Sequence, residues 1–192
     1  MRGDPYDDPR ITAIGLFDEA HGGLMARFAA QFAEHRLTQV EYEVLLRLVR
    51  SPEGALRMTD LAAQTQLTTS GITRVVDRLE RDGMVDRRAC PTDRRGLLAT
   101  VTKTGRDRLD AVLPGHLALV DEWFLDRLGP DQRDTFLAAL RTIRDAVRPD
   151  ATAGAPPDQP RPDRPRPDRR GAAGEVAPAG APSSVTRWRR PG

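Results

Sequence analysis

Cysteine is nearly absent from this sequence, which has one, Cys90, among its 192 residues. One cysteine cannot form a disulfide within the chain, and such sparing use is typical of a reducing compartment. The sequence also has no apolar run long enough to cross a membrane, and residues 1–20 lack the basic-then-apolar pattern of a signal peptide. These absences predict a cytoplasmic protein and argue against a secreted or membrane-spanning one.

The motifs that many enzymes carry are missing as well. We find no glycine-rich loop after a strand, no Ser-His-Asp set and no metal-binding motif. The three histidines, His21, His35 and His116, belong to no cluster with the spacing of metal ligands. We therefore expect a protein that is not an enzyme and that needs neither a metal nor another cofactor.

An excess of one charge is also lacking, since the formal net charge is only +2, but the charge is unevenly distributed. Residues 56–106 carry ten basic and six acidic side chains, a net of +4, whereas residues 1–55 and 107–148 have nets of −3 and −2. A basic segment between acidic flanks is typical of a protein that binds the phosphate backbone of a nucleic acid.

The basic segment contains an amphipathic helix that is predicted to run from a cap at Thr68 to a left-handed residue at Gly83. Apolar residues recur at spacings of three and four and form one buried stripe: Ile72, Val75, Val76 and Leu79. The opposite face is polar, with Thr69, Ser70, Thr73, Arg74, Asp77, Arg78 and Arg81. Small hydroxyls let such a helix approach a duplex closely, and arginines can reach phosphates or guanine edges.

The segments around this helix complete a winged helix-turn-helix, expected over residues 38–102. A capping box at Thr38 begins one helix, Thr59 is expected to cap a second, and Gln66 lies in the tight turn before the amphipathic helix. Residues 84–101 then show the pattern of a β-hairpin with a basic tip. The predicted class is therefore mainly α with a small β-hairpin wing (α+β).

Long apolar helices are predicted on both sides of this unit, over residues 10–35 and 103–147. Pro114 lies inside the second of them and predicts a kink. Residues 1–9 are polar and interrupted by proline, and residues 148–192 are rich in Pro, Arg, Ala and Gly. Both ends are predicted to be disordered, because neither holds enough apolar side chains to form a core.

Three motifs occur together: the amphipathic helix with its flank at 69–85, the turn at Asp93, Arg94 and Arg95, and Val-Thr-Lys-Thr-Gly at 101–105. Together they resemble the MarR family of bacterial transcription regulators, whose wing carries Asp-x-Arg followed by Leu-Thr-x-x-Gly. The resemblance covers residues from about 10 to 147. The chain departs from it with Thr65-Gln66, where the family usually has Leu-Gly, and with Val101 for leucine.

The resemblance implies a symmetric homodimer in which the outer helices of two chains interlock. Two winged units would then bind successive major grooves of a pseudo-palindromic operator, with each wing in the adjoining minor groove. Most members repress neighbouring genes, and many release DNA when a small phenolic or other lipophilic effector binds between the dimer helices and the DNA-binding unit. A dimer would also cover the apolar stripes that a lone chain leaves exposed.

The expected roles differ along the binding surface. The leading end of the recognition helix is expected to meet base edges or nearby phosphates through Thr69, Ser70, Thr73 and Arg74. Arg78 and Arg81 lie deeper and are expected to contact phosphate or to form salt bridges. Arg94 is expected to enter the minor groove, while Asp93 and Arg95 pair and stiffen the wing. Four residues could line an effector pocket: Phe17, His21, His116 and Trp123.

Other interpretations stay open at this point. A winged helix that binds only other proteins would not need the arginine surface around Arg74. Cys90 could be a redox sensor, although family members that sense peroxides place their cysteine near the start of the first helix. The arginines of the tail could form an extra DNA-binding arm, although its aspartates dilute their charge.

Overall fold

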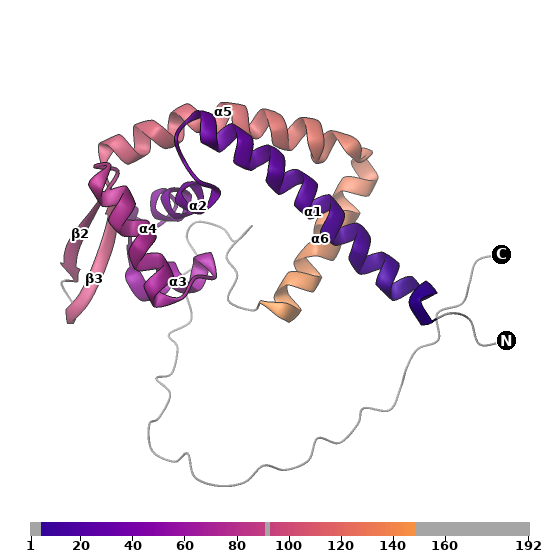
Figure 1. The fold of residues 1–192 in the computed structure, drawn as a ribbon, viewed down its shortest axis with the longest axis horizontal. Helices are drawn as coiled ribbons and strands as arrows, with labels where there is room; N and C mark the ends of the chain where they lie inside the picture. The colour runs from indigo at the N-terminus through magenta and orange to yellow at the C-terminus, as the bar shows by residue number, and fades with distance from the viewer. Residues whose placement is uncertain (1–4, 91–92, 149–192) are drawn as a thin grey trace, which may run out of the picture. The chain divides into compact units, whose positions relative to one another are not determined.

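The computed structural model describes residues 5–90 and 93–148, without the side chains of Pro5 and of residues 93–95. The predicted tail at 148–192 lies outside the described residues, except for Arg148. The helices, in chain order, are α1 (Pro9–Glu34), α2 (Gln39–Val49), α3 (Met58–Thr65), α4 (Thr69–Arg81), α5 (Lys103–Trp123) and α6 (Pro130–Val147) (Figure 1). The strands are β1 (Ala55–Arg57), β2 (Val85–Cys90) and β3 (Asp93–Val101). This mainly helical fold with one small sheet confirms the predicted class.

The first helix begins earlier than its sequence pattern predicts, because Asp8 caps it. The Asp8 carboxylate accepts a hydrogen bond from the Arg10 backbone N–H at 2.8 Å and from the Arg10 guanidinium at 2.6 Å. The hydrogen bonds from the Arg10 side chain and backbone lower the pKa of Asp8 to about 2. A short 3-10 helix, η1 (Pro5–Asp7), precedes the cap.

The capping box at the start of α2 is confirmed. Thr38 Oγ1 accepts the Glu41 N–H at 3.3 Å, and Glu41 Oε2 accepts the Thr38 N–H at 2.8 Å. Thr59, however, does not cap α3, which begins at Met58 with Arg57 at its N-cap. The reason is that strand β1 leads directly into this helix.

The turn between α3 and α4 has the left-handed residue that the sequence pattern requires. Gln66 has a φ of 58°, and the next N–H, that of Leu67, donates to the Ala62 carbonyl at 3.1 Å. Thr68 Oγ1 then accepts the Gly71 N–H at 3.1 Å and caps α4. Gly83, with a φ of 68°, ends the helix, as predicted, and turns the chain into β2.

The wing is part of a three-stranded antiparallel sheet with the order β1-β3-β2. Ala99 of β3 lies opposite Leu56 of β1 on one side and opposite Arg87 of β2 on the other. An irregularity between Ala89 and Cys90 shifts the register near the turn of the hairpin. The sheet therefore joins the wing to the strand that enters the helix-turn-helix.

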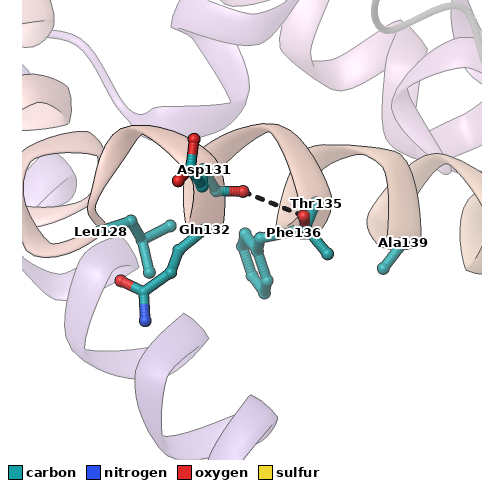
Figure 2. Close-up of a pocket in the computed structure, with 6 residues that line it drawn as sticks. All are labelled: Leu128, Asp131, Gln132, Thr135, Phe136 and Ala139. Atoms are coloured by element: carbon teal, nitrogen blue, oxygen red, sulfur yellow. Dashed lines mark hydrogen bonds between the residues drawn. The ribbon is translucent and has the colours of Figure 1, made fainter.

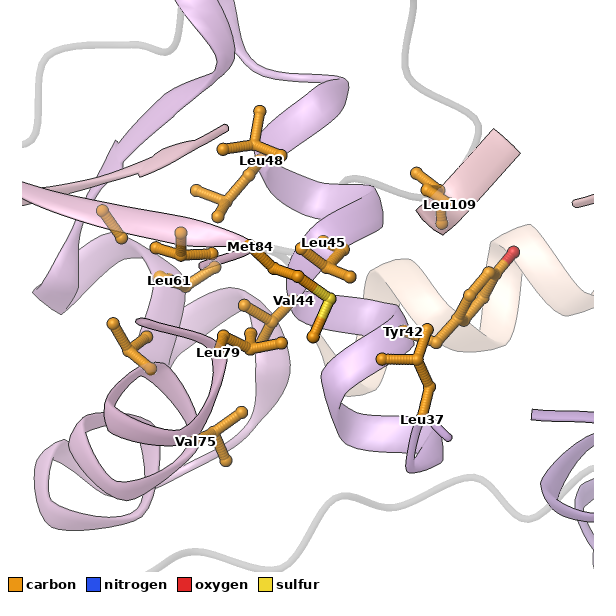
Figure 3. Close-up of a cluster of buried hydrophobic side chains, with 14 of the residues drawn as sticks. Leu37, Tyr42, Val44, Leu45, Leu48, Leu61, Val75, Leu79, Met84 and Leu109 are labelled. Carbon is orange, nitrogen blue, oxygen red and sulfur yellow. The ribbon is translucent and has the colours of Figure 1, made fainter. Parts of the chain in front are cut away.

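One hydrophobic core joins α2 to the helix-turn-helix, the sheet and α5 (Figure 3). Its largest fully buried side chains are Phe32, Leu45, Leu48, Leu61, Ile72, Leu79, Val44, Val76, Val85 and Val112. Gly105 is needed where α5 meets this core, because a Cβ there would clash with the Met84 carbonyl. This contact gives a physical reason for the glycine of the Thr-x-x-Gly motif.

The outer helices leave much of their apolar surface exposed. Thr102 caps α5 as predicted, but α5 ends at Trp123 and a short 3-10 helix, η3 (Leu125–Arg127), leads to α6. Helix α6 has no buried residue. The exposed large apolar side chains on α1, α5 and α6 are Ile11, Ile14, Leu16, Phe17, Leu117, Phe136, Ile143 and Val147. Among the described residues, no helix has the length and hydropathy needed to span a bilayer.

Candidate nucleic-acid interface

Helix α4 presents a polar outer face. Its apolar stripe, Ile72 to Leu79, is buried in the core, so the opposite side must face outward. The four residues predicted to lie at the leading end of the contact surface are all exposed: Thr69, Ser70, Thr73 and Arg74. The structure therefore brings these predicted residues together on one turn and a half of helix, as a duplex-reading helix requires.

The hydroxyls at this end are held by local hydrogen bonds. Thr68 Oγ1, which caps the helix, lies 3.2 Å from Ser70 Oγ. Thr73 Oγ1 donates to the Thr69 carbonyl at 2.8 Å. Because the Thr73 proton is used within the helix, the outward lone pairs of this hydroxyl are left to accept hydrogen bonds.

The arginines of α4 fall into two groups. Arg74 and Arg81 are exposed and form no ion pair with any side chain in the described part of the chain. Their charge is therefore available to phosphate. Arg78 instead donates from Nε to Glu41 Oε1 at 2.8 Å, and its side chain stays 46% exposed. The Nε atom is held by α2 while the rest of the guanidinium can still reach outward.

Glu41 links the capping box of α2 to the recognition helix. Its carboxylate is largely buried, and it accepts from the Thr38 N–H, the Thr38 hydroxyl and Arg78. Burial alone raises the pKa of this carboxyl, but the hydrogen bonds from Thr38 and Arg78 outweigh burial and lower it. Sequence reasoning found the capping box but not the partner on α4, because the two residues lie 37 positions apart.

Arg87 on strand β2 is a second residue that sequence reasoning missed. Its Nη2 donates to Asp77 Oδ1 at 2.6 Å and to the Thr73 carbonyl at 3.2 Å, and its Nη1 donates to Glu80 Oε2 at 2.5 Å. The sequence predicted a basic hairpin but did not single out Arg87 among its basic residues. Arg88, the next residue, is exposed and lies 3.8 Å from Asp86, a much looser pair.

The wing residues Asp93, Arg94 and Arg95 belong to β3, but their side chains lie outside those described. Their predicted roles, minor-groove insertion for Arg94 and mutual pairing for the other two, therefore stay predictions. The backbone places all three at the end of the hairpin that lies farthest along the strands from Thr102 and α5.

The four residues predicted for an effector pocket occur in three separate settings. Phe17 and His21 stack on each other at 6.1 Å on the exposed side of α1. His116 packs at 4.7–5.0 Å against Phe28, Phe32 and Tyr42, and burial lowers its pKa. Arg27 lies 3.4 Å above the ring of Trp123, and Arg127 lies 5.0 Å from it. The effector role of these residues stays a prediction.

An open hollow lies along α6 (Figure 2). It measures about 530 Å³ and is lined by Leu128, Asp131, Gln132, Thr135, Phe136 and Ala139. None of the predicted effector residues lines it. Figure 2 shows Leu128 and Phe136 on the same side of the helix, and Phe136 is one of the exposed apolar side chains named above. No group of three or more His, Cys, Asp or Glu in the described residues could hold a metal ion.

The comparisons with known proteins agree with this geometry. A family model, MarR family, matches residues 36–96, which extend from just after α1 into β3. The crystal structure of AbsC, a MarR family transcriptional regulator from Streptomyces coelicolor, is 30% identical, with a TM-score of 0.71 over 78% of this chain and 99% of that one. The chain belongs to the MarR family.

Two further MarR-type relatives bear on function. Sco3205, a MarR family transcriptional regulator from Streptomyces coelicolor, was solved in complex with DNA; it is 30% identical, with a TM-score of 0.69, over 78% of this chain and 93% of its own. The HTH-type transcriptional repressor YetL of Bacillus subtilis is 30% identical over 109 residues, which are 57% of this chain and 65% of YetL. The matched region of this chain thus spans slightly less than two thirds of that curated relative.

Proposed function

We propose that this MarR family member is a sequence-specific DNA-binding transcription regulator that acts as a dimeric repressor. The observation that carries the proposal is the exposed outer face of α4, where small hydroxyls precede Arg74, Arg78 and Arg81 beside a basic hairpin. The complex of Sco3205 with DNA and the repressor YetL support the same assignment. Such a regulator would act in the bacterial cytoplasm, on the nucleoid, by binding rather than by turnover.

The dimer is part of the proposal because one recognition helix contacts only one half-site of a pseudo-palindromic operator. Helix α6 buries none of its residues, and Phe136 and Ile143 are 37% and 59% exposed. A second copy of the chain would cover these side chains together with those of α1 and α5. A two-fold dimer would also hold two recognition helices about 34 Å apart, the spacing of successive major grooves.

The contacts on each half-site follow from position and charge. Thr69, Ser70, Thr73 and Arg74 would meet base edges and adjacent phosphates in the major groove. Arg78 would meet phosphate while Glu41 holds its Nε. Arg94 would enter the minor groove, where runs of A·T pairs narrow it, and Asp93 and Arg95 would stiffen the wing.

The proposed effector is a small lipophilic or phenolic molecule that binds between the dimer helices and the DNA-binding unit. Trp123 and His116 are aromatic residues of α5, and α5 contacts α1, α2 and the core of the winged unit. A ligand that separated these helices would change the distance between the two copies of α4. Phe17 and His21 lie on the exposed side of α1 and would reach such a site only in the dimer.

Selection of bound genomic fragments with the purified full chain tests the function. We expect one or a few fragments to be enriched, with pseudo-palindromic half-sites about one helical turn apart. Random duplex of the same length is the control. Binding that is equal for selected and random duplex would exclude sequence-specific recognition.

The rival function is a winged helix that binds only other proteins. The exposed arginines of α4 argue against it, because an interface with protein does not need three cations in one row. DNA affinity that stays constant between about 50 and 200 mM salt would support the rival, since neutralising phosphates releases counterions and makes affinity fall with salt.

A further inference from the structure

Arg87 is the most fully paired cation near the recognition helix. Its side chain is only 20% exposed, although it lies on the short strand β2 of the wing. The guanidinium bridges Asp77 at 2.6 Å and Glu80 at 2.5 Å. Because both nitrogens of the fork are engaged with carboxylates, Arg87 has little capacity left for a direct contact with DNA.

The two carboxylates lie on the part of α4 that borders the proposed DNA surface. Asp77 is four residues after Thr73 and three after Arg74, so helical geometry places the three side chains next to one another. Asp77 and Glu80 are 47% and 40% exposed. Unpaired, they would present two negative charges to the phosphates that Arg74 and Arg81 are expected to neutralise.

We propose that Arg87 sets the DNA affinity of the recognition helix without touching DNA, by pairing with Asp77 and Glu80. It is a positioning residue, and its contribution passes through these two side chains. This inference rests on the proposed function, because it assigns a consequence to the approach of a duplex. It also explains why a helix that reads DNA can carry two acidic residues at its flank.

A mutant cycle tests this coupling. Arg87→Ala should weaken binding to a selected operator about tenfold, because two carboxylates are uncovered near phosphates. The same substitution in the Asp77→Asn, Glu80→Gln background should cost less than about threefold, because no carboxylates remain to be uncovered. The Asp77→Asn, Glu80→Gln variant itself separates the two roles: it should bind operator at least as tightly as the wild type if Arg87 covers the carboxylates, and more weakly if the ion pairs only hold the wing in place.

Arg88→Ala is the matched control, because it removes the same charge one residue along β2 from a side chain that is 66% exposed. Its effect should be the same, within about twofold, with and without the Asp77 and Glu80 substitutions. Thermal unfolding of every variant shows whether it is folded at the assay temperature. If Arg87→Ala is unfolded, Arg87→Gln, which removes the charge but keeps a long polar side chain, takes its place in the cycle with the same expected losses.

A measurement without DNA keeps the inference separate from the proposed function. Proton exchange of the Arg87 guanidinium, followed by NMR, should be slower in the wild type than in the Asp77→Asn, Glu80→Gln variant. Equally fast exchange would overturn the ion pairs and the inference with them. Equal losses in both backgrounds, with a wild type that binds operator, would overturn the inference alone. A wild type that binds no duplex would overturn the proposed function as well as the inference.

Discussion

The link from α2 to α4 through Glu41 gives a prediction about stability that can be worked out from the structure. Glu41→Ala removes three interactions at once: the hydrogen bonds from the Thr38 N–H at 2.8 Å and from the Thr38 hydroxyl at 2.9 Å, and the ion pair with Arg78 at 2.8 Å. Glu41→Gln is the matched variant, since glutamine can still accept from Thr38 in a capping box but carries no charge. The two substitutions therefore separate the cap from the ion pair.

The expected magnitudes differ between the two variants. Loss of a helix cap costs about 1 kcal/mol, and an ion pair with a half-exposed partner contributes about 0.5 kcal/mol after solvent screening. We therefore expect the free energy of unfolding to fall by roughly 1.5 kcal/mol in Glu41→Ala and by roughly 0.5 kcal/mol in Glu41→Gln at pH 7. Added salt should reduce only the smaller, charge-dependent part.

The assay is denaturant unfolding of the wild type and both variants at several pH values. The interactions of Glu41 lower its pKa below 4.5 in the folded state. A depressed carboxyl pKa stabilises the folded state fully above the unfolded value, and this stabilisation is lost as the pH falls through the folded value. The difference in free energy of unfolding between wild type and Glu41→Gln should therefore stay at roughly 0.5 kcal/mol from pH 6 to 8. It should disappear as the solution is acidified below about pH 4.5.

Two results would refute this reasoning. One is a Glu41→Gln variant as stable as the wild type at pH 7, which would mean that the ion pair with Arg78 contributes nothing. The other is a gap that does not change on acidification, which would place the effect in packing and not in the charge of Glu41. Arg78→Ala, combined with each variant, should show non-additive losses if the pair is real.

Three further substitutions are predicted together. Arg74→Ala should weaken operator binding by at least tenfold, because one unpaired arginine at the leading end is worth about 1–3 kcal/mol; a gel-shift titration with equal affinities would contradict this. Arg94→Ala should lower the slope of log affinity against log salt by about one, and an unchanged slope would remove the wing contact. Gln66→Gly should raise the free energy of unfolding by up to roughly 1 kcal/mol, because a side chain is strained at a φ of 58°; a destabilised variant, measured by denaturant unfolding, would show that Gln66 is not strained.

Local signals predicted most of the fold. The capping box at Thr38, the cap at Thr68 and the left-handed residues Gln66 and Gly83 all occur as expected. Each depends on residues within a few positions of one another, so sequence spacing is enough to find it. Where the prediction missed, as at Thr59, a neighbouring strand changed the boundary of the helix.

The interactions that join distant segments could not be read from the sequence. Arg87 pairs with side chains seven and ten positions away on another element, and Glu41 pairs with one 37 positions away. Many basic residues of the segment could have made either contact. The packing of His116 against Phe28, Phe32 and Tyr42 likewise depends on how three helices meet.

Strand β1 is only three residues long, but it has a mechanical consequence. It pairs with β3 through Leu56 and Ala99 and continues without a break into α3. A hairpin without this third strand would be connected to the helix-turn-helix only through the link to α4 and could rotate about that link. With β1 in place, the hairpin is connected to the helix-turn-helix at two points, and we expect the two to move as one rigid body. Any large displacement should then occur where this body meets α1 and α5.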